Sequence, residues 1–241
     1  MGCFFVSNVD ESELVKFSNL ASEWWDGESF SALHRINPLR VQYILENLQE
    51  ATNSGKRLLD IGCGGGLICE AMARLGFSVT GVDPCREGIE AARQHAAIEG
   101  LDIEYHFTDI ESFIHSSECS SYDIITLMEV VEHIPDLTEF LSSSCKLLKP
   151  GGMLFISTLN RTIKSMLLGK IAAEYILRMV PPGTHQWKKF VKPSEIHDAL
   201  LKSGVLVKDI KGITYKILHN DWVLNDRDIS VNYILAAQKE Q

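Results

Sequence analysis

The sequence has no excess of basic residues: 23 lysines and arginines stand against 32 aspartates and glutamates, which gives a formal net charge of −9. Because nucleic-acid binding needs a basic face that neutralises phosphates, nucleic acid is not an expected partner. The sequence also has no apolar run of the roughly 18–20 residues that a membrane span requires. Its first residues, MGCFFVSNVDESE, show neither a secretory signal nor an Arg-rich transit segment.

Paired cysteine spacing is absent as well, because the six cysteines form no C-x-x-C pair and no spacing typical of a zinc site. We therefore expect no disulfide framework, and a reducing compartment. The remaining composition is that of an ordinary globular protein, with 45% hydrophobic and 23% charged residues, which excludes a disordered chain or a collagen-like repeat. The length of 241 residues suits one α/β domain with attachments.

The middle of the chain alternates short apolar runs with amphipathic stretches, a pattern typical of βαβ units around a mostly parallel sheet. It predicts strands at residues 57–61, 77–82, 103–107, 123–127, 153–157, 205–210 and 231–237. Helices are expected at residues 67–75, 87–99, 137–148 and 193–202, with a turn at 150–152 before the fifth strand.

We expect a single domain over residues 1–241, divided into four parts. These are an N-terminal helical cap at 1–50, with helices near 11–25 and 39–48, a cofactor-binding core at 51–159, an insertion or lid at 160–192, and the C-terminal part of the sheet at 193–241. Trp24 and Trp25 in the cap either pack in the interior or stack on a substrate ring, and packing is the commoner role of aromatic residues.

A glycine-rich turn, Asp60-Ile61-Gly62-Cys63-Gly64-Gly65-Gly66, follows the first expected strand and precedes a helix. Glycine lets the backbone turn sharply and approach a ligand that a Cβ atom would exclude, and the helix behind it offers unpaired N–H groups. Leu67 stands where a dinucleotide fingerprint needs its third glycine, which disfavours a dehydrogenase. The D-x-G-x-G-x-G spacing instead resembles the S-adenosylmethionine loop of the Rossmann-like class I methyltransferases.

Two acidic residues at later strand ends are further candidates for the cofactor site. Asp83 follows the second strand, where a carboxylate can accept hydrogen bonds from both ribose hydroxyls of a nucleoside; alternatively, it caps the following helix. Asp109 follows the third strand, and it either receives the adenine amino group or caps the helix that begins after it. The glycine turn and Asp83 together predict a nucleoside cofactor site, while both interpretations of Asp109 stay open.

A third cluster, Glu129, Glu132 and His133, follows the fourth strand at the same edge of the sheet. If this stretch turns helically, the three side chains project toward one side. Two carboxylates and an imidazole suit a divalent ion. The alternative is that these residues hydrogen-bond the backbone and cap the next helix.

Several strings outside these motifs are characteristic of one family. They are FSNLASEWWD at 17–26, LHRINPLR at 33–40, STLNR at 157–161, AEYILR at 173–178, GTH at 183–185 and DISVNYI at 228–234. With the glycine turn and the acidic cluster, they resemble the ubiquinone-biosynthesis O-methyltransferase family of bacteria and mitochondria, from about residue 17 to the end. The resemblance implies a Rossmann-like class I α/β fold with a mostly parallel seven-stranded sheet and helices on both faces. The lack of a transit segment favours a bacterial protein.

The resemblance also implies roles for individual residues. Arg40, Gly62, Asp83 and Met128 match its S-adenosylmethionine-binding positions, and we add Asp60, Gly64 and Asp109 as further expected cofactor residues. Glu129, Glu132 and His133 match its ligands for a divalent metal, usually magnesium, and are the expected catalytic residues. Because His133 cannot be both a ligand and a free base, we assign no general base.

The implied reaction is metal-assisted O-methylation of polyprenylated catechols in ubiquinone biosynthesis, from 3-demethylubiquinol to ubiquinol and from 2-polyprenyl-6-hydroxyphenol to its methoxy product. A phenol with a pKa of about 10 is a poor nucleophile at neutral pH, and a metal that binds both catechol oxygens favours the phenolate. One alternative is methylation of another small catechol. Another is a non-catalytic scaffold that binds S-adenosylmethionine inside a lipid-biosynthesis complex, which the intact glycine turn and acidic cluster disfavour.

The insertion reverses the charge of the rest of the protein, with seven basic residues and one acidic residue between Arg161 and Lys192. Apolar residues at 163, 167, 171, 175 and 179 predict an amphipathic helix. Such a stretch suits docking on anionic lipid, where a polyprenyl substrate resides, and predicts a cytoplasmic protein peripheral to the inner face of the membrane. The alternative is a substrate lid packed on the protein itself. A ubiquinone-biosynthesis complex is a further implied partner.

Overall fold

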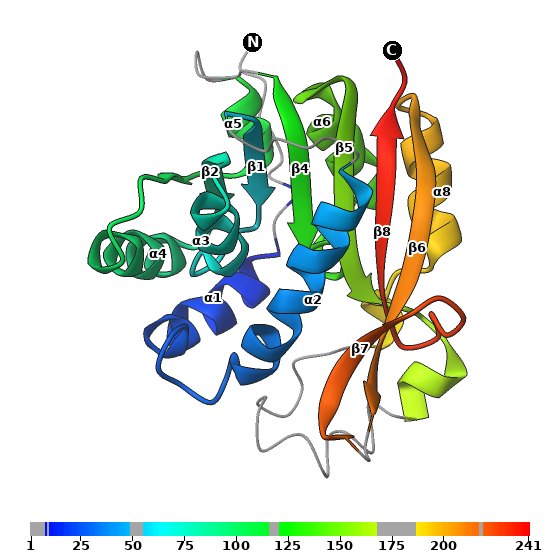
Figure 1. The fold of residues 1–241 in the computed structure, drawn as a ribbon, viewed down its shortest axis with the longest axis horizontal. Coiled ribbons are helices and arrows are strands. Elements are labelled where there is room, and N and C mark those ends of the chain that lie inside the picture. Colours follow the sequence, from blue (N-terminus) through cyan, green and yellow to red (C-terminus); the bar gives the residue numbers. More distant parts are fainter. Residues whose placement is uncertain (1–7, 9, 49–54, 116–120, 168–186, 217–218) are drawn as a thin grey trace.

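The structure is a computed structural model that describes residues 8, 10–48, 55–115, 121–167, 187–216 and 219–241. Within these residues, a single mixed β-sheet lies between two layers of helices (Figure 1). The strand order is β3-β2-β1-β4-β5-β8-β6-β7, so the expected Rossmann-like α/β architecture is confirmed. In the part of the chain that is described, no helix combines the length and the low polarity needed to span a bilayer.

The first part of the sheet is parallel. It consists of β1 (Arg57–Ile61), β2 (Ser78–Asp83), β3 (Glu104–Phe107), β4 (Tyr122–Met128) and β5 (Leu148–Leu159). The five strands expected here are confirmed to within a few residues. β5 begins earlier than expected, because the turn at 150–152 is an irregularity within the strand and not a loop before it.

The remaining strands are antiparallel to their neighbours, and there is one more of them than the sequence predicts. β8 (Asn232–Lys239) lies between β5 and β6 (Val205–Lys216), and β6 also pairs with β7 (Asp221–Asn225). Figure 1 shows this β6–β7 hairpin extending past the ends of the other strands. The expectation of seven strands is therefore wrong, since the described residues form eight. β7 is short, and its Trp222 and Leu224 pack against the helical layer that contains α2, a tertiary contact without a local sequence pattern.

Alternate residues of the central strands enter two separate cores. One core packs under α2 (Ser31–Asn47), α3 (Leu67–Arg74) and α4 (Arg86–Ile98). The other packs under α5 (Ile110–Ile114), α6 (Leu137–Lys146) and α8 (Pro193–Leu201). Leu58 and Leu59 of β1 illustrate the alternation, because they are adjacent in sequence and belong to opposite cores.

The N-terminal residues form α1 (Glu11–Leu20), the short η1 (Ala21–Glu23) and α2, and Figure 1 shows α2 crossing one face of the sheet. The expected helix near 11–25 is confirmed as α1 and η1. α2 begins at Ser31 and not at 39, because it continues through Pro38. Ile36 on one side of the proline and Tyr43 on the other are buried in the same core, and this packing holds both halves in one helix.

Candidate functional site

The glycine-rich turn connects β1 to α3 and is held against the neighbouring strand. Gly62 N and Cys63 N both donate to Val82 O, at 2.8 and 3.2 Å. Gly62, Gly64 and Gly66 have φ angles of +74°, +50° and +88°, a backbone region that disfavours side chains. The turn therefore has the tight backbone shape expected of a cofactor loop, and it lies where β1 ends between β2 and β4.

Asp83, the last residue of β2, binds this turn directly. Its Oδ2 accepts a hydrogen bond from Gly64 N at 2.8 Å, and its Oδ1 accepts one from Cys85 N at 2.7 Å. Burial raises the pKa of Asp83 to about 6, although both backbone donors favour the charged form. The bond to Cys85 is the local contact by which an aspartate stabilises a turn. Binding of ribose hydroxyls by Asp83 stays a prediction.

Two other candidate carboxylates of the cofactor site accept hydrogen bonds from the protein. Asp60 accepts from Thr126 Oγ1 at 2.6 Å and from Cys69 Sγ at 3.4 Å, which ties β1 to β4 and α3. Burial raises the pKa of Asp60 to about 6. Asp109 accepts from Ser112 N at 2.7 Å and is the N-cap of α5. The capping interpretation of Asp109 is confirmed, and its contact with adenine stays a prediction.

Two tryptophans of the N-terminal cap cover the glycine turn. A Cβ atom at Gly64 or Gly65 would lie within 2.4 or 2.5 Å of Trp24 side-chain atoms, so this packing requires glycine at both positions. Trp24 also stacks on Phe30, with ring centroids 3.8 Å apart, and Trp25 Nε1 donates to Gly65 O at 3.1 Å. The packing interpretation of the two tryptophans is confirmed.

Arg40 of α2 and Glu129 after β4 form an ion pair at the same edge, with 2.8 Å between Nη2 and Oε1. Arg40 is 3% exposed, and its Nε has no hydrogen-bond partner among the described residues. Glu129 has a φ angle of +57° and is held by Ser157, whose Oγ donates to Oε1 at 2.8 Å. Met128, the last residue of β4, packs against the core under α2. Arg40, which we expect to bind the cofactor, is thus paired with Glu129, which we expect to bind a metal ion.

Glu132 is buried beside this pair and is 4% exposed. Its Oε2 accepts a hydrogen bond from Thr158 Oγ1 at 2.7 Å, while its Oε1 has no hydrogen-bond partner in the described part of the chain. Burial, and then the negative charge of Glu129, raise the pKa of Glu132 to about 8. A buried carboxylate oxygen left unsatisfied beside a second carboxylate is a location where a cation is favoured.

His133 does not join the two carboxylates. After Glu129 the chain makes only the single turn η2 (Val131–His133), so the helical turn expected to bring all three side chains to one side is not formed. His133 Nδ1 instead lies 3.2 Å from Glu13 Oε2 of α1. Among the residues described, no three His, Cys, Asp or Glu side chains are arranged to hold a metal ion. The ligand roles of Glu129, Glu132 and His133 therefore stay predictions.

A cavity of about 490 Å³ lies beside η2, a volume within the range of small-molecule sites. Glu132 and His133 line it on the side of the acidic cluster. Val131, Ile134, Pro135 and Leu137 of the same stretch contribute an apolar wall. The lining is completed from four other segments by Asp10, Arg161, Lys188, Lys189, Phe190, Val191 and Glu195. The cavity thus combines an apolar wall with titratable groups.

Comparison with known proteins identifies a family. The family described as methyltransferase domain matches residues 33–207. The ubiquinone biosynthesis O-methyltransferases of Brucella anthropi and Saccharophagus degradans are 44% and 43% identical to this chain. The alignments cover 97% and 96% of this chain and 97% of each relative. The chain belongs to the ubiquinone biosynthesis O-methyltransferase family.

Solved structures with a similar fold have lower sequence identity to this chain than the relatives named above. The magnesium protoporphyrin IX methyltransferase of Synechocystis, solved with bound SAH, is 18% identical with a TM-score of 0.66 over 94% of both chains. A SAM-dependent methyltransferase of Methanosarcina mazei is 22% identical with a TM-score of 0.60, over 82% of this chain and 97% of that one. At these identities the likeness concerns the fold, which is that of the class I S-adenosylmethionine-dependent methyltransferases.

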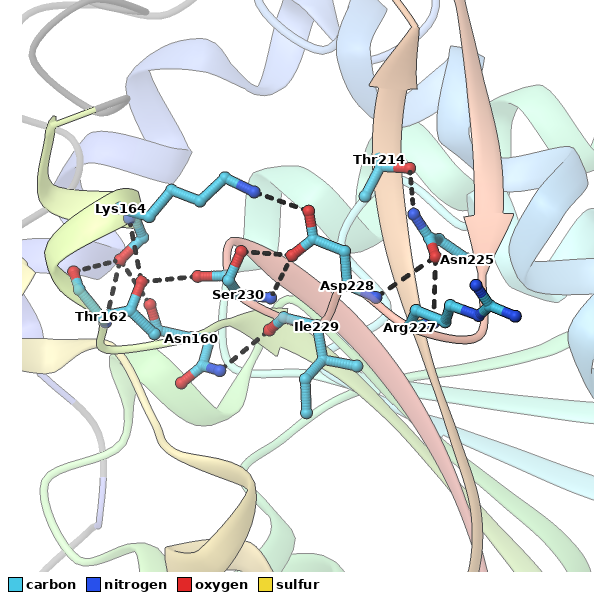
Figure 2. A network of polar contacts seen from close by, with 10 residues as sticks. Asn160, Thr162, Lys164, Thr214, Asn225, Arg227, Asp228, Ile229 and Ser230 are labelled. Carbon is cyan, nitrogen blue, oxygen red and sulfur yellow. Dashed lines mark hydrogen bonds and ion pairs between the residues drawn. The ribbon is translucent and has the colours of Figure 1, made fainter.

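The first residues of the insertion of this family member are fixed to the loop before β8. Figure 2 shows Lys164 reaching toward Asp228, with 2.6 Å between Nζ and Oδ2. The hydrogen bond from Lys164 is the main cause that lowers the pKa of Asp228 to about 2. Thr162 Oγ1 donates to Ser230 O at 2.6 Å in the same network. These contacts fix the point at which the chain leaves β5.

Three basic residues of the insertion pair with acidic side chains of the protein. Besides Lys164, these are Arg161, which pairs with Glu195, and Lys189, which pairs with Asp10 at 2.9 Å. Part of the basic charge that the sequence shows is therefore balanced internally. The structure does not describe the middle of the insertion. Outside the described residues lie Lys170, Arg178, the apolar positions 171, 175 and 179 and the strings at 173–178 and 183–185.

Three hydroxyl residues have site contacts that sequence reasoning did not assign. Thr126, Ser157 and Thr158 are fully buried, and each donates a hydrogen bond to a carboxylate of the site. Their acceptors are, respectively, Asp60, Glu129 and Glu132. The sequence signal was available, since each hydroxyl interrupts an apolar run near the end of a strand, where a buried polar group needs a partner. Glu13 shows no comparable signal.

Proposed function

We propose that this protein transfers the methyl group of S-adenosylmethionine to a hydroxyl oxygen of polyprenylated catechols in ubiquinone biosynthesis. The acceptors are 3-demethylubiquinol and 2-polyprenyl-6-hydroxyphenol, which give ubiquinol and the methoxy product. Relatives that align along 97% of the chain carry the name of this activity. The observation that carries the proposal is the pair formed by the partly exposed Glu129 and the buried Glu132 beside the glycine turn. A Cβ at Gly62 would lie 2.4 Å from Val130, the residue that follows Glu129.

The proposed donor site uses groups that the protein leaves available. A methyl group on a sulfonium is already activated, so the main task of the protein is to align it with the attacking oxygen. Arg40 supports this role, because its buried Nε has no hydrogen-bond partner among the described residues. A guanidinium edge of this kind suits the carboxylate of the methionine part of the donor.

The two carboxylates also fit a divalent cation, which we propose as the second cofactor, with magnesium favoured by their oxygen ligands. Glu132 Oε1 is buried without a hydrogen-bond partner in the described residues, and Glu129 is close enough to raise the pKa of Glu132. Glu129 and Glu132 would hold the ion, while His133 fits less well because it faces Glu13. Such an ion supplies Lewis acidity that favours the phenolate of a catechol and orients its two oxygens. Ser157 and Thr158 keep the two carboxylates in place.

A transfer assay with the full chain tests the proposed activity. Purified protein is incubated with labelled S-adenosylmethionine and a short-tailed catechol quinol, with magnesium or with excess chelator. We expect a labelled methyl ether that forms only in the presence of the quinol and of the metal. The absence of any labelled ether with magnesium present would contradict the proposal. Equal transfer to a catechol without a tail would favour the alternative, methylation of another small catechol.

We further propose that the insertion binds anionic lipid, which would place the protein peripherally on the cytoplasmic face of a membrane. Support comes from Ile163 and Leu167, which occupy a helical turn over 163–167 and are 71% and 51% exposed. Their spacing of four residues puts both on one helix face. The internal pairing of Arg161, Lys164 and Lys189 reduces the charge available for this contact.

Liposome flotation tests the membrane contact. We expect the protein to float with vesicles that contain anionic lipid and to float less after Ile163→Ser and Leu167→Ser together. Ile98→Ser is the matched control, because Ile98 is 74% exposed on α4, outside the insertion. Binding that is absent, equal on neutral vesicles, or unchanged in the double variant would contradict an electrostatic and apolar contact through this segment.

A further inference from the structure

His133 lies against α1, where it meets two residues that are one helical turn apart. Glu13 Oε2 is 3.2 Å from His133 Nδ1. The Phe17 ring meets the imidazole edge to face, with centroids 5.3 Å apart and an interplanar angle of 88°. Residues at i and i+4 lie on one side of a helix. α1 therefore presents a carboxylate and an aromatic wall to the same imidazole.

The carboxylate of Glu13 is buried and has one oxygen available for His133. Glu13 is 5% exposed, and its Oε1 accepts from Lys16 Nζ at 3.0 Å and from Lys189 Nζ at 3.2 Å. Its Oε2 is buried and lies near His133 Nδ1, but in these side-chain positions the two atoms are not aligned for a hydrogen bond. Leaving a buried carboxylate oxygen without a donor is costly, and the imidazole nitrogen is at a suitable distance to be that donor.

The position of α1 relative to His133 is fixed from both sides. Asn8 Nδ2 donates to Asp136 O at 2.7 Å, and Asp136 N donates to Asn8 Oδ1 at 2.8 Å. Lys189, in η3 (Trp187–Lys189) at the end of the insertion, pairs with Asp10 at 2.9 Å as well as with Glu13. The residues before α1, the loop after η2 and the end of the insertion therefore meet around Glu13, although they are distant in sequence.

We propose that Glu13 is a positioning residue for His133. After a small rotation of the imidazole, Oε2 accepts its Nδ1–H, which fixes the neutral tautomer that has its lone pair on Nε2, while Phe17 packs edge to face against the ring. A hydrogen bond to one ring nitrogen is the usual way in which a protein selects the reactive state of the other. His133 and Glu132 line the same cavity, which places the imidazole beside the site of the proposed function. The kinetic consequences of the inference rest on that function, whereas the tautomer does not.

The tautomer is measured directly on the full chain labelled with [15N]histidine, without a divalent ion and at about pH 8.5, above the usual histidine pKa. Long-range 1H–15N spectra distinguish the two neutral tautomers, and the loss of signals in His133→Gln assigns His133. We expect the Nδ1–H tautomer in the unmodified protein and in Glu13→Gln, whose amide oxygen still accepts. In Glu13→Ala we expect a shift toward Nε2–H. An Nε2–H tautomer in the unmodified protein would overturn the inference, even if Glu13→Ala does not fold.

Steady-state kinetics supply the second readout. We expect Glu13→Ala to lower kcat by about 10- to 100-fold, the usual cost of losing a residue that orients an active-site histidine, with the KM for the donor nearly unchanged. Glu13→Gln should restore most of kcat. Glu46→Ala is the matched control, since Glu46 is a helical glutamate whose ion pair with Lys211, at 3.5 Å, lies on a different surface.

The outcomes separate this inference from the proposed function. If the unmodified protein methylates no catechol but shows the Nδ1–H tautomer and loses it in Glu13→Ala, the proposed function fails and the positioning contact stands. If methylation is observed and Glu13→Ala leaves the tautomer and kcat unchanged, the inference fails and the proposed function stands. A Glu13→Gln variant as impaired as Glu13→Ala would also overturn the inference, because it would assign the effect to charge and not to an accepted hydrogen bond.

Discussion

Arg40 Nη2 lies 2.8 Å from Glu129 Oε1, so the residue expected to bind the methyl donor and a residue expected to bind a metal share one ion pair. Arg40 comes from the N-terminal cap and Glu129 from the end of β4. The contact fastens the cap over the edge of the sheet at the place where both cofactors are proposed to bind. Because Arg40 is 3% exposed, burying its guanidinium requires an acidic partner within the protein, and Glu129 is that partner.

Removing the guanidinium should therefore destabilise the fold. We expect Arg40→Met to lower the free energy of unfolding by about 3 kcal/mol, because it leaves the carboxylate of Glu129 without its partner cation. Urea unfolding at neutral pH measures the change.

A double variant and a surface pair serve as controls for this prediction. Adding Glu129→Gln to Arg40→Met should recover part of the loss, since it removes the charge that became unpaired. Lys149→Met breaks the half-exposed pair with Asp123 and should cost less than about 1 kcal/mol. Equal costs for Arg40→Met and Lys149→Met would contradict a buried role for the first pair.

A methyl group added to the glycine turn should displace the cap. In Gly65→Ala the new Cβ would lie 2.5 Å from Trp24, and φ at this position is not left-handed, so steric overlap is the main effect. We expect a loss of about 1–3 kcal/mol of stability, typical of overpacking. Thermal unfolding measures it.

The same substitution in a Trp24→Leu background should cost less than it does alone, because the ring that the methyl group meets is absent. Gly88→Ala is the control within α4, where a Cβ would make only ordinary contacts at 3.5 Å. It should be neutral or stabilising by up to about 1 kcal/mol, the helical preference for alanine over glycine. If Gly65→Ala lowers the stability equally with Trp24 present and in the Trp24→Leu background, the packing explanation is contradicted.

The buried Asp60 should make stability fall as the pH rises through the acidic range. Burial raises its pKa from 3.8 to about 6 in the folded protein. Between these values the folded state binds more protons than the unfolded state, so the free energy of unfolding decreases with increasing pH. The contribution is complete below 3.8 and is lost as the pH passes about 6.

Asp60→Asn, which cannot ionise, should remove this dependence. As the pH is raised from about 4 to about 7, we expect the free energy of unfolding of the variant to increase relative to that of the unmodified protein. Urea unfolding of both proteins across this range gives the difference. Asp226→Asn, at a side chain that is 81% exposed, is the control and should leave the difference flat. A flat difference for Asp60→Asn would show that Asp60 titrates alike in both states.

Glu132→Gln should separate the acidic cluster from the donor site. The amide keeps the shape of the side chain but lacks the charge that a cation needs, so metal-dependent transfer should fall by at least about tenfold. Donor affinity, measured by calorimetry, should stay nearly unchanged, because Glu132 contacts Thr158 and not the glycine turn.

The exposed Glu139 of α6 supplies the matched control for that variant, and Glu139→Gln should transfer methyl groups at the normal rate. Full activity in Glu132→Gln, or undiminished activity of the unmodified protein in excess chelator, would remove the metal from the mechanism.

Part of the site could be predicted from short segments because its geometry is local. The glycine turn needs left-handed backbone angles at Gly62, Gly64 and Gly66, and only glycine adopts them readily, so the loop is visible in the sequence. Asp83 is visible for a similar reason, since it ends a strand next to that loop. The second role of Gly64 and Gly65, accommodating Trp24, was not visible because Trp24 is about 40 residues away.

The directions in which the side chains of the acidic cluster project could not be predicted in the same way. Whether Glu129, Glu132 and His133 face one side depends on the backbone angles of residues 129–133, and Glu129 takes a positive φ while Ser157 and Arg40 hold its side chain. β7 was missed for a related reason, because its apolar residues pack against the helical layer that contains α2 and lie in a strand too short to show alternation.

The sequence by itself determined the order of the elements apart from β7, the glycine turn and the family, because backbone preference, hydrophobic period and motif spacing act over short distances. Only the tertiary structure decided which side chains meet. Arg40 reached Glu129, Glu13 reached His133 and Trp24 reached Gly65 because the N-terminal helices fold back over the edge of the sheet. Burial and pairing of charges depend on that packing, so the electrostatics of the site is a property of the folded chain.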